Sequence, residues 1–175
     1  MKWVILVAGV IVGIGLLMVV IGLLLPRNHI ATSQVELKQP IDSVWATVRA
    51  LGDTPSFWPE LKSASRMPDV EGKETWGQTM KNGFNLPLVI DEERPPNLLV
   101  TRIVAKHAPF GGVWRYSLEP VNSGTRITVT EDGWVSNPMF RVISRLMGHH
   151  TTLDSYLKGL SRKFGEETVP THKWD

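Results

Sequence analysis

The chain of 175 residues contains no cysteine. This absence excludes a disulfide scaffold, a thiol nucleophile and any metal site with cysteine ligands. An excess of one charge is also lacking. Lys2 is the only charged residue among the first 26, and the remainder carries 18 basic and 17 acidic groups. A nucleic-acid surface needs a concentration of positive charge, so we expect no nucleic-acid partner.

Motifs of several enzyme classes are also absent. The sequence has no His-Glu-x-x-His zinc motif, no glycine-rich phosphate loop with a lysine and no Gly-x-Ser-x-Gly nucleophile motif. His149 and His150 are adjacent, so on a helix their side chains point about 100° apart and cannot bind one metal ion together. His29, His107 and His172 fall in a predicted linker, loop and tail. We expect no metal ion and no cofactor.

The N-terminal residues form one long apolar run. Residues 3–25 contain no charged side chain. As a helix these 23 residues span about 35 Å, slightly more than the roughly 30 Å hydrocarbon core of a bilayer. A secretory signal has a shorter apolar region that ends in a small-residue cleavage site, whereas this run ends in Leu-Leu-Leu-Pro-Arg. The run predicts an uncleaved, single-pass membrane helix.

The surroundings of this run leave two questions open and constrain a third. Lys2 on one side nearly balances Arg27 and Lys38 on the other, so the side of the membrane that holds the soluble domain is undetermined. Gly9 and Gly13 form a Gly-x-x-x-Gly pattern, which makes a homodimer through this face one possibility. The spacer 26–29 reaches at most about 14 Å, so we expect the domain to lie close to the lipid headgroups.

The soluble part begins with a strand and two short pieces, then changes to a run of strands. Residues 30–38 alternate as a strand, 40–51 have helical apolar spacing, and a second helical or irregular piece surrounds 57–61. From Ser63 onward, turn signals separate six strands, which their short connections force to be antiparallel. These turns are expected at 71–73, 82–83, 94–97, 110–112 and 122–124.

A long helix is predicted to cover the apolar face of this sheet. Asn137 and Pro138 are typical of a helix start, and the helix is expected to continue to Phe164. Its apolar stripe has steps of three and four residues: Ile143, Leu146, Met147, Leu153, Leu157, Leu160 and Phe164. We therefore divide the chain into an anchor and linker at 1–29, a domain at 30–165 and a mobile tail at 166–175.

This element order resembles the START-like (SRPBCC) superfamily, including its polyketide cyclase/dehydrase-like and birch-pollen-allergen-like branches. The resemblance implies an α+β helix-grip fold over residues 30–164, in which a curved antiparallel sheet of about seven strands grips a long C-terminal helix and two short helices follow the first strand. The N-terminal membrane helix is not part of the family pattern. The matching stretches are Pro-Ile-Asp-Ser-Val-Trp at 40–45, Phe-Trp-Pro at 57–59, Arg-Pro-Pro-Asn-Leu-Leu at 94–99 and Ser-Gly-Thr-Arg-Ile-Thr-Val-Thr-Glu at 123–131.

The resemblance also implies a cavity between sheet and helix that accepts a hydrophobic small molecule or a lipid. Large side chains such as Trp114 and Tyr116 either line such a pocket or fill a solid core, and the sequence leaves both open. The residues expected to contact a ligand are those on the inward faces of strands and helix: Trp76, Met80, Leu88, Ile90, Thr101, Ile103, Trp114, Tyr116, Ile127, Val129, Ile143, Met147 and His150.

Two titratable residues are candidates for catalysis. His150 falls within the apolar stripe of the predicted helix, with Asp154 four residues on to hold its ring. Glu131 is in phase with Ile127 and Val129, which directs its carboxylate toward the cavity or its rim. The alternatives are a histidine at the edge of the core and a carboxylate in contact with water.

Three functions remain. The first is a membrane-anchored module that binds a hydrophobic small molecule or lipid, with the bilayer and that ligand as its partners. The second is a cyclase- or aromatase-like enzyme in which His150 and Glu131 transfer protons. The third is a non-enzymatic interaction or stress-related protein, for which an exposed apolar patch outside the cavity would be evidence. The fold alone does not choose among them.

Overall fold

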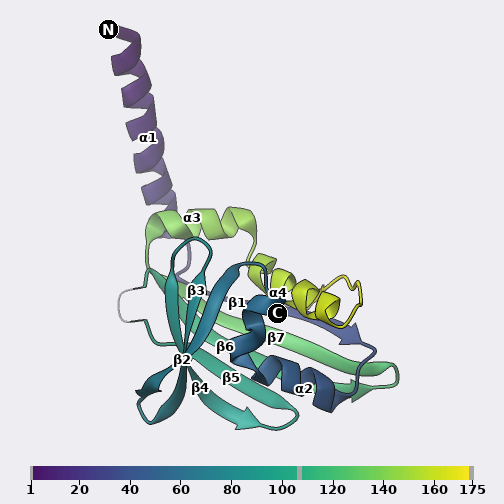
Figure 1. Ribbon diagram of the computed structural model, residues 1–175. Coiled ribbons are helices and arrows are strands. Elements are labelled where there is room, and N and C mark those ends of the chain that lie inside the picture. Colours follow the sequence, from purple (N-terminus) through teal and green to yellow (C-terminus); the bar gives the residue numbers. More distant parts are fainter. Residues whose placement is uncertain (1, 106–107, 174–175) are drawn as a thin grey trace.

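The computed structural model describes residues 2–105 and 108–173. One long helix, α1 (Lys2–Leu24), projects from an α+β domain (Figure 1). The domain contains one sheet of eight strands in the order β2-β3-β4-β5-β6-β7-β1-β8. Its elements in chain order are β1 (Asn28–Leu37), α2 (Ile41–Arg49), the 3-10 helix η1 (Leu51–Ser56), β2 (Leu61–Val70), β3 (Lys73–Met80), β4 (Asn85–Arg94), β5 (Leu98–Ile103), β6 (Phe110–Val121), β7 (Gly124–Val135), α3 (Pro138–Met147), α4 (Thr151–Lys163) and β8 (Thr171–Lys173).

The sheet confirms the predicted helix-grip fold. Strands β2 to β7 form an antiparallel meander. The first strand, β1, pairs antiparallel with the last strand of this meander, β7, from Asn28 opposite Trp134 to Leu37 opposite Thr125. Short turns produce this order because they can only connect neighbouring antiparallel strands. One expected turn was wrong: residues 110–112 lie in β6, and the β5–β6 connection precedes them. His107, expected in a loop, lies outside the described residues.

The C-terminal tail also departs from the prediction. Thr171–Lys173 form β8, which pairs with β1 through Thr32 opposite Lys173 and Gln34 opposite Thr171. The part of the chain expected to be mobile therefore adds an eighth strand at the edge of the sheet. Trp174 and Asp175 lie outside the described residues.

The predicted long C-terminal helix is two helices. Asn137 begins α3 as expected, since its Oδ1 accepts hydrogen bonds from the N–H groups of Met139 and Phe140 at 2.9 and 3.2 Å. Gly148 ends α3 with a φ of +85°, a left-handed conformation that favours glycine. Only the α4 part of the predicted stripe covers the core, through the fully buried side chains of Leu153, Leu157 and Leu160.

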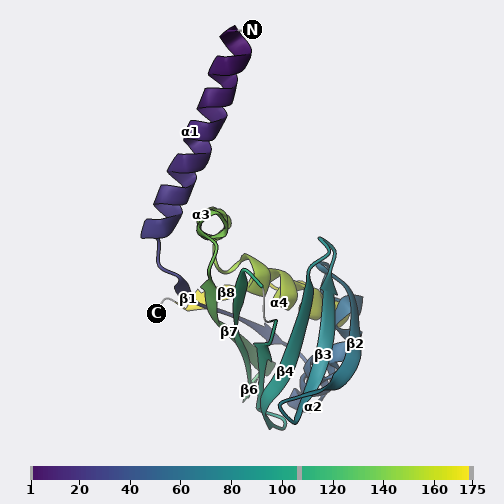
Figure 2. The same cartoon turned by 90° about the vertical axis from the view of Figure 1, so that its left-hand side faces the viewer.

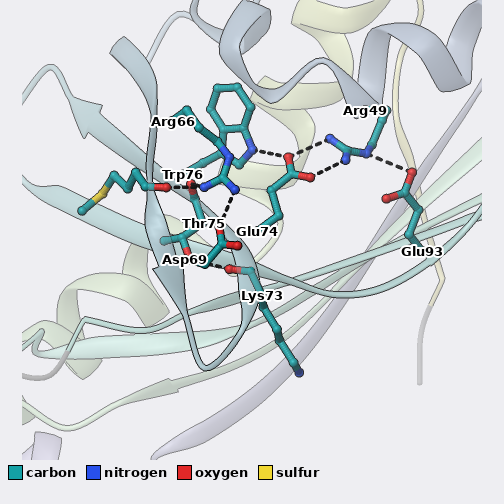
Figure 3. Close-up of polar contacts among 9 residues, drawn as sticks. Arg49, Arg66, Asp69, Lys73, Glu74, Thr75, Trp76 and Glu93 are labelled. Carbon is teal, nitrogen blue, oxygen red and sulfur yellow. Dashed lines mark hydrogen bonds and ion pairs between the residues drawn. The ribbon is translucent and has the colours of Figure 1, made fainter.

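An ion-pair network attaches α2 to the sheet (Figure 3). The Arg49 guanidinium donates to the Glu74 carboxylate on β3 at 3.1 and 2.7 Å and to Glu93 on β4 at 2.9 Å. The Trp76 indole N–H donates to the same Glu74 at 2.7 Å. The Arg49 hydrogen bonds hold the pKa of Glu74 below its usual value, so the network stays charged at neutral pH. Its side chains are partly exposed, so the network fixes position more than it adds stability.

The helix α1 is long and apolar enough to cross a membrane, and its most apolar stretch is not buried by the domain. Its C-terminal end contacts α3. A Cβ atom at Gly22 would lie 2.1 Å from the carbonyl oxygen of Pro138, so only glycine permits this approach. Arg141 on α3 is 4% exposed and donates to four main-chain carbonyls. These are the carbonyls of Gly22 at 2.8 Å, Leu25 at 3.3 Å, Val135 at 2.8 Å and Ser136 at 2.8 Å.

We expect the substitution Arg141→Met to lower the free energy of unfolding of the domain by about 2 to 4 kcal/mol, because it leaves buried carbonyls without donors. Arg145→Met is the matched control, since Arg145 lies on the same helix and is exposed. Urea unfolding of the full-length protein in detergent, followed by tryptophan fluorescence, measures the difference. Equal stability of the two variants would contradict the role given to Arg141.

Candidate ligand-binding cavity

A cavity of about 290 Å³ lies between the sheet and the helices α3 and α4. This volume is near the lower end of the range for small-molecule pockets, roughly 300–1,000 Å³. The domain is therefore hollow. The lining residues come from β1, β3 to β7, α3, the start of α4 and the connections between them: His29, Trp58, Gln78, Met80, Asn82, Phe84, Leu86, Leu88, Thr101, Ile103, Phe110, Gly111, Trp114, Tyr116, Glu131, Trp134, Val135, Phe140, Ser144, Met147, Gly148, His149, Thr151 and Thr152.

Aromatic side chains form the inner wall of the cavity. The rings of Trp58, Trp114 and Tyr116 line it, and Tyr156 of α4 packs behind them with centroid distances of 5.6, 5.9 and 5.6 Å. Burial raises the pKa of Tyr116, and a hydrogen bond to Thr101 only partly offsets this. Burial also raises the pKa of Tyr156. Both phenols are therefore neutral at physiological pH, and the inner wall carries no charge.

A few polar groups interrupt this apolar lining. Gln78 and Thr101 line the cavity and are buried. The indole N–H of Trp58 is also buried, and it has no hydrogen-bond partner within the part of the chain that the structure describes. An unpaired buried donor is costly, and a ligand acceptor atom beside it would remove that cost.

Three titratable side chains meet at one edge of the cavity. His29 at the start of β1 stacks on His149 with ring centroids 4.4 Å apart. The His29 Nε2 atom lies 3.7 Å from the Glu131 Oε1 atom of β7. Burial, followed by repulsion from His29, lowers the pKa of His149, so this imidazole is neutral at pH 7. Among residues 2–105 and 108–173, no three histidine, aspartate or glutamate side chains are grouped to hold a metal ion.

The cavity extends to the end of the sheet from which α1 projects. In this antiparallel sheet the β3–β4 turn, the start of β6, the end of β7 and the start of β1 lie at the same end. Five lining residues at this end are exposed or partly exposed, although Leu86, Gly111 and Val135 beside them are buried. Lining residues further along the strands, such as Leu88 and Tyr116, are buried. Figure 2 shows α3 and the β3–β4 turn on the side of the domain toward α1. The exposed or partly exposed residues are Asn82, Phe84, Phe110, Trp134 and Phe140.

The structure brings about half of the predicted ligand-binding residues to the cavity. These are Met80, Leu88, Thr101, Ile103, Trp114, Tyr116 and Met147. The others lie elsewhere. Ile90, Ile127 and Val129 are buried in the solid part of the core, and Ile143 is exposed on α3. The indole N–H of Trp76 is bonded to Glu74, outside the cavity lining (Figure 3).

The predicted pair of His150 and Glu131 does not meet in the cavity. Glu131 lines it, but His150 precedes α4, where its Nδ1 atom lies 3.3 Å from the Ser33 hydroxyl. Its ring stacks on His172 of β8 at 4.0 Å. Asp154 accepts a hydrogen bond from Ser33 at 2.8 Å, and its carboxylate lies 3.0 Å from the His172 Nε2 atom. The break at Gly148 changes the helical phase, so His149 lines the cavity in place of His150.

Several lining residues were not predicted from the sequence. Phe84 and Leu86 share a strand face with Leu88, so the alternation in β4 would have identified them. The glycine before the two histidines is a helix-stop signal that would have placed His149 differently. His29 and Trp58 gave no local signal, because strand pairing and helix packing alone bring them to the cavity.

The comparisons with known proteins agree with this architecture. Residues 28–163 match the family described as "Polyketide cyclase / dehydrase and lipid transport". A conserved protein from Geobacillus kaustophilus has a similar structure, with a TM-score of 0.63 and 15% identity over 78% of this chain and 95% of that chain. A protein from Mesorhizobium loti gives a TM-score of 0.58 and 16% identity, over 77% and 98% of the two chains.

The di-domain ARO/CYC StfQ from the steffimycin biosynthetic pathway is also similar, with a TM-score of 0.62 and 10% identity. The match covers 79% of this chain and 52% of StfQ, so this chain spans about half of that protein. No curated protein matches the sequence. At these identities the structural matches show the fold alone, whereas the family match covers most of the chain and supports a module that binds a hydrophobic ligand or acts as a cyclase. Because the family match covers residues 28–163, the chain belongs to the polyketide cyclase/dehydrase and lipid transport family.

Proposed function

We propose that the protein is a membrane-anchored module that binds one hydrophobic small molecule, or the apolar part of a lipid, in the cavity between the sheet and α3 and α4. The observation that carries this proposal is the hollow itself, about 290 Å³ bounded mostly by apolar and aromatic side chains. A core that served stability alone would be filled, since empty space in a core destabilises a protein.

The size and polarity of the cavity restrict its ligand. Its volume of about 290 Å³ lies near the lower end of the range for small-molecule pockets, roughly 300–1,000 Å³. One ring system or part of one acyl chain fits, whereas a complete diacyl lipid exceeds this space. The group of His29, Glu131 and His149 at the cavity edge suits a polar end that donates a hydrogen bond to the carboxylate. The expected ligand is therefore amphipathic, with its apolar part inside.

The proposed anchor gives this cavity a supply of apolar ligands. Residue Arg27, three residues after α1, already bonds to the sheet, since its carbonyl accepts from the Val135 N–H at 2.8 Å. The domain therefore lies directly beside the end of α1. If α1 spans a bilayer, membrane lipids and dissolved apolar molecules are at high local concentration near the cavity.

The cyclase alternative has less support in this chain. Its two proposed proton-transfer residues do not share a reacting position, because His150 contacts Ser33 and His172 while Glu131 lines the cavity. The likeness to an ARO/CYC protein shows the common fold at 10% identity. We therefore favour the ligand-binding function over the cyclase function.

A bulky residue in the cavity tests the binding proposal. We expect Ile103→Trp to reduce the amount of a co-purifying hydrophobic compound at least five-fold, because Ile103 lines the cavity and an indole occupies ligand space. Ile30→Trp is the matched control, since Ile30 is exposed and outside the lining. Mass spectrometry of compounds bound to the gently extracted full-length proteins measures this.

Lipids held around α1 are common to both variants, so they do not affect the comparison. Near-ultraviolet circular dichroism verifies that both variants keep the native packing. If no compound differs between Ile103→Trp and Ile30→Trp, the cavity is not a binding site.

The lowered pKa of His149 leads us to expect that the stability of the domain depends on pH. The folded state lowers the pKa of His149, so the unfolded chain binds more protons once the pH falls below about 6.5, the ordinary histidine value. The free energy of unfolding should therefore decrease as the pH falls from 7 to 5. In His149→Gln this decrease should be smaller, as measured by urea unfolding at several pH values. Identical pH profiles would show that His149 is not held neutral by its site.

A further inference from the structure

One face of α3 is apolar and uncovered. Met139, Ile143 and Leu146 follow the spacing of one helix face and are 43%, 41% and 80% exposed. Exposed apolar faces of this kind mark sites of interaction with a membrane or another protein. The adjacent face of the same helix lines the cavity through Phe140, Ser144 and Met147. The helix α3 therefore lies between the cavity and the surroundings of its own exposed apolar face.

The position of α3 relative to α1 indicates what covers that face. The Gly22–Pro138 contact and the hydrogen bonds from Arg141 to the carbonyls of Gly22 and Leu25 hold α3 against the last turn of α1. Figure 1 shows α3 running across the foot of α1, and Figure 2 shows it end on beside that foot. A helix that crosses the end of a membrane-spanning helix lies along the membrane surface.

We infer that α3 lies in the interfacial layer of the bilayer that α1 spans, with Met139, Ile143 and Leu146 among the lipids, and that the cavity opens onto this layer. The inference rests on the proposed function, because it requires α1 to be a membrane anchor. Amphipathic helices in this position bury their apolar face about 5–10 Å into the boundary between headgroups and acyl chains. The ligand then passes from bilayer to cavity beside α3 without crossing bulk water.

Two further features of this end of the domain fit a bilayer surface. The opposite rim of the cavity is the β3–β4 turn, where Asn82 and Phe84 line the cavity at the same end of the sheet. The exposed cations Arg27, Lys81 and Arg145 lie at this end, where they suit anionic lipid headgroups. An apolar helix face with neighbouring cations is typical of a helix that lies on a membrane.

The absence of cysteine from the sequence allows a direct test by depth-dependent quenching. Single cysteines at Leu146→Cys, Asn82→Cys, Val12→Cys and Ser123→Cys are labelled with a bimane in the full-length protein. The proteins are reconstituted in vesicles of phosphatidylcholine and phosphatidylglycerol at a ratio of 7 to 3, with or without brominated phosphatidylcholine. Ser123 is the control for distance, because it lies in the turn before β7, about 36 Å along that strand from α3.

We expect brominated lipid to reduce the fluorescence of the Val12 and Leu146 labels at least two-fold, to reduce that of the Asn82 label more weakly, and to leave the Ser123 label unchanged. Quenching at Val12 without quenching at Leu146 would overturn this inference while the anchor stands, including the case in which a second copy or another protein covers α3. Quenching at Leu146 without quenching at Asn82 would overturn the opening toward the bilayer. No quenching at Val12 would overturn the anchor, and with it the proposed function.

Discussion

The arrangement of this protein depends on one buried cation. Arg141 joins two parts of the chain that are distant in the sequence. Its guanidinium donates to the carbonyls of Gly22 and Leu25 at the end of α1 and to those of Val135 and Ser136 between β7 and α3. The last carbonyls of a helix have no donor within it, and a cation is favourable at that end. These hydrogen bonds hold the end of α1 against the domain, so the short segment between α1 and β1 does not act as a free linker. The positions of the cavity opening and of α3 both follow from this junction.

The second constraint is the break between α3 and α4. A continuous helix over the same residues would place its whole apolar stripe on the sheet. Gly148 ends α3, so of the two helices only α4 packs on the core, while α3 lies against the end of α1. The space between α3 and the sheet is the cavity. The cavity therefore exists because the helix is interrupted. The same interruption leaves the apolar face of α3 exposed and brings His149 beside His29 and Glu131.

Aromatic packing makes one end of this hollow stable without a ligand. Trp58, Trp114, Tyr116 and Tyr156 pack with tilted or edge-on rings, which is the favourable geometry for aromatic pairs. Polarity then increases from this neutral wall toward the edge near α1, where the carboxylate and imidazoles lie. Such a gradient suits an amphipathic guest and gives it one preferred orientation. The carboxylate and the imidazoles lie at the edge, whereas the aromatic wall holds only neutral phenols and indoles.

The amino-acid pattern alone determined the apolar N-terminal helix, the antiparallel meander and the family resemblance, because each depends on local periodicity and on turns between neighbouring strands. Met80, Leu88 and Tyr116 were predicted as cavity residues for the same reason: alternation assigns the face of a strand. Periodicity does not show whether two facing elements touch or leave a space between them. The tertiary structure alone therefore decided that Ile127 and Val129 lie in solid core, that His149 replaces His150, and that residues 171–173 form an edge strand. It also decided that Arg141 joins α1 to α3, since contacts between residues more than a hundred positions apart arise only when the whole chain has packed.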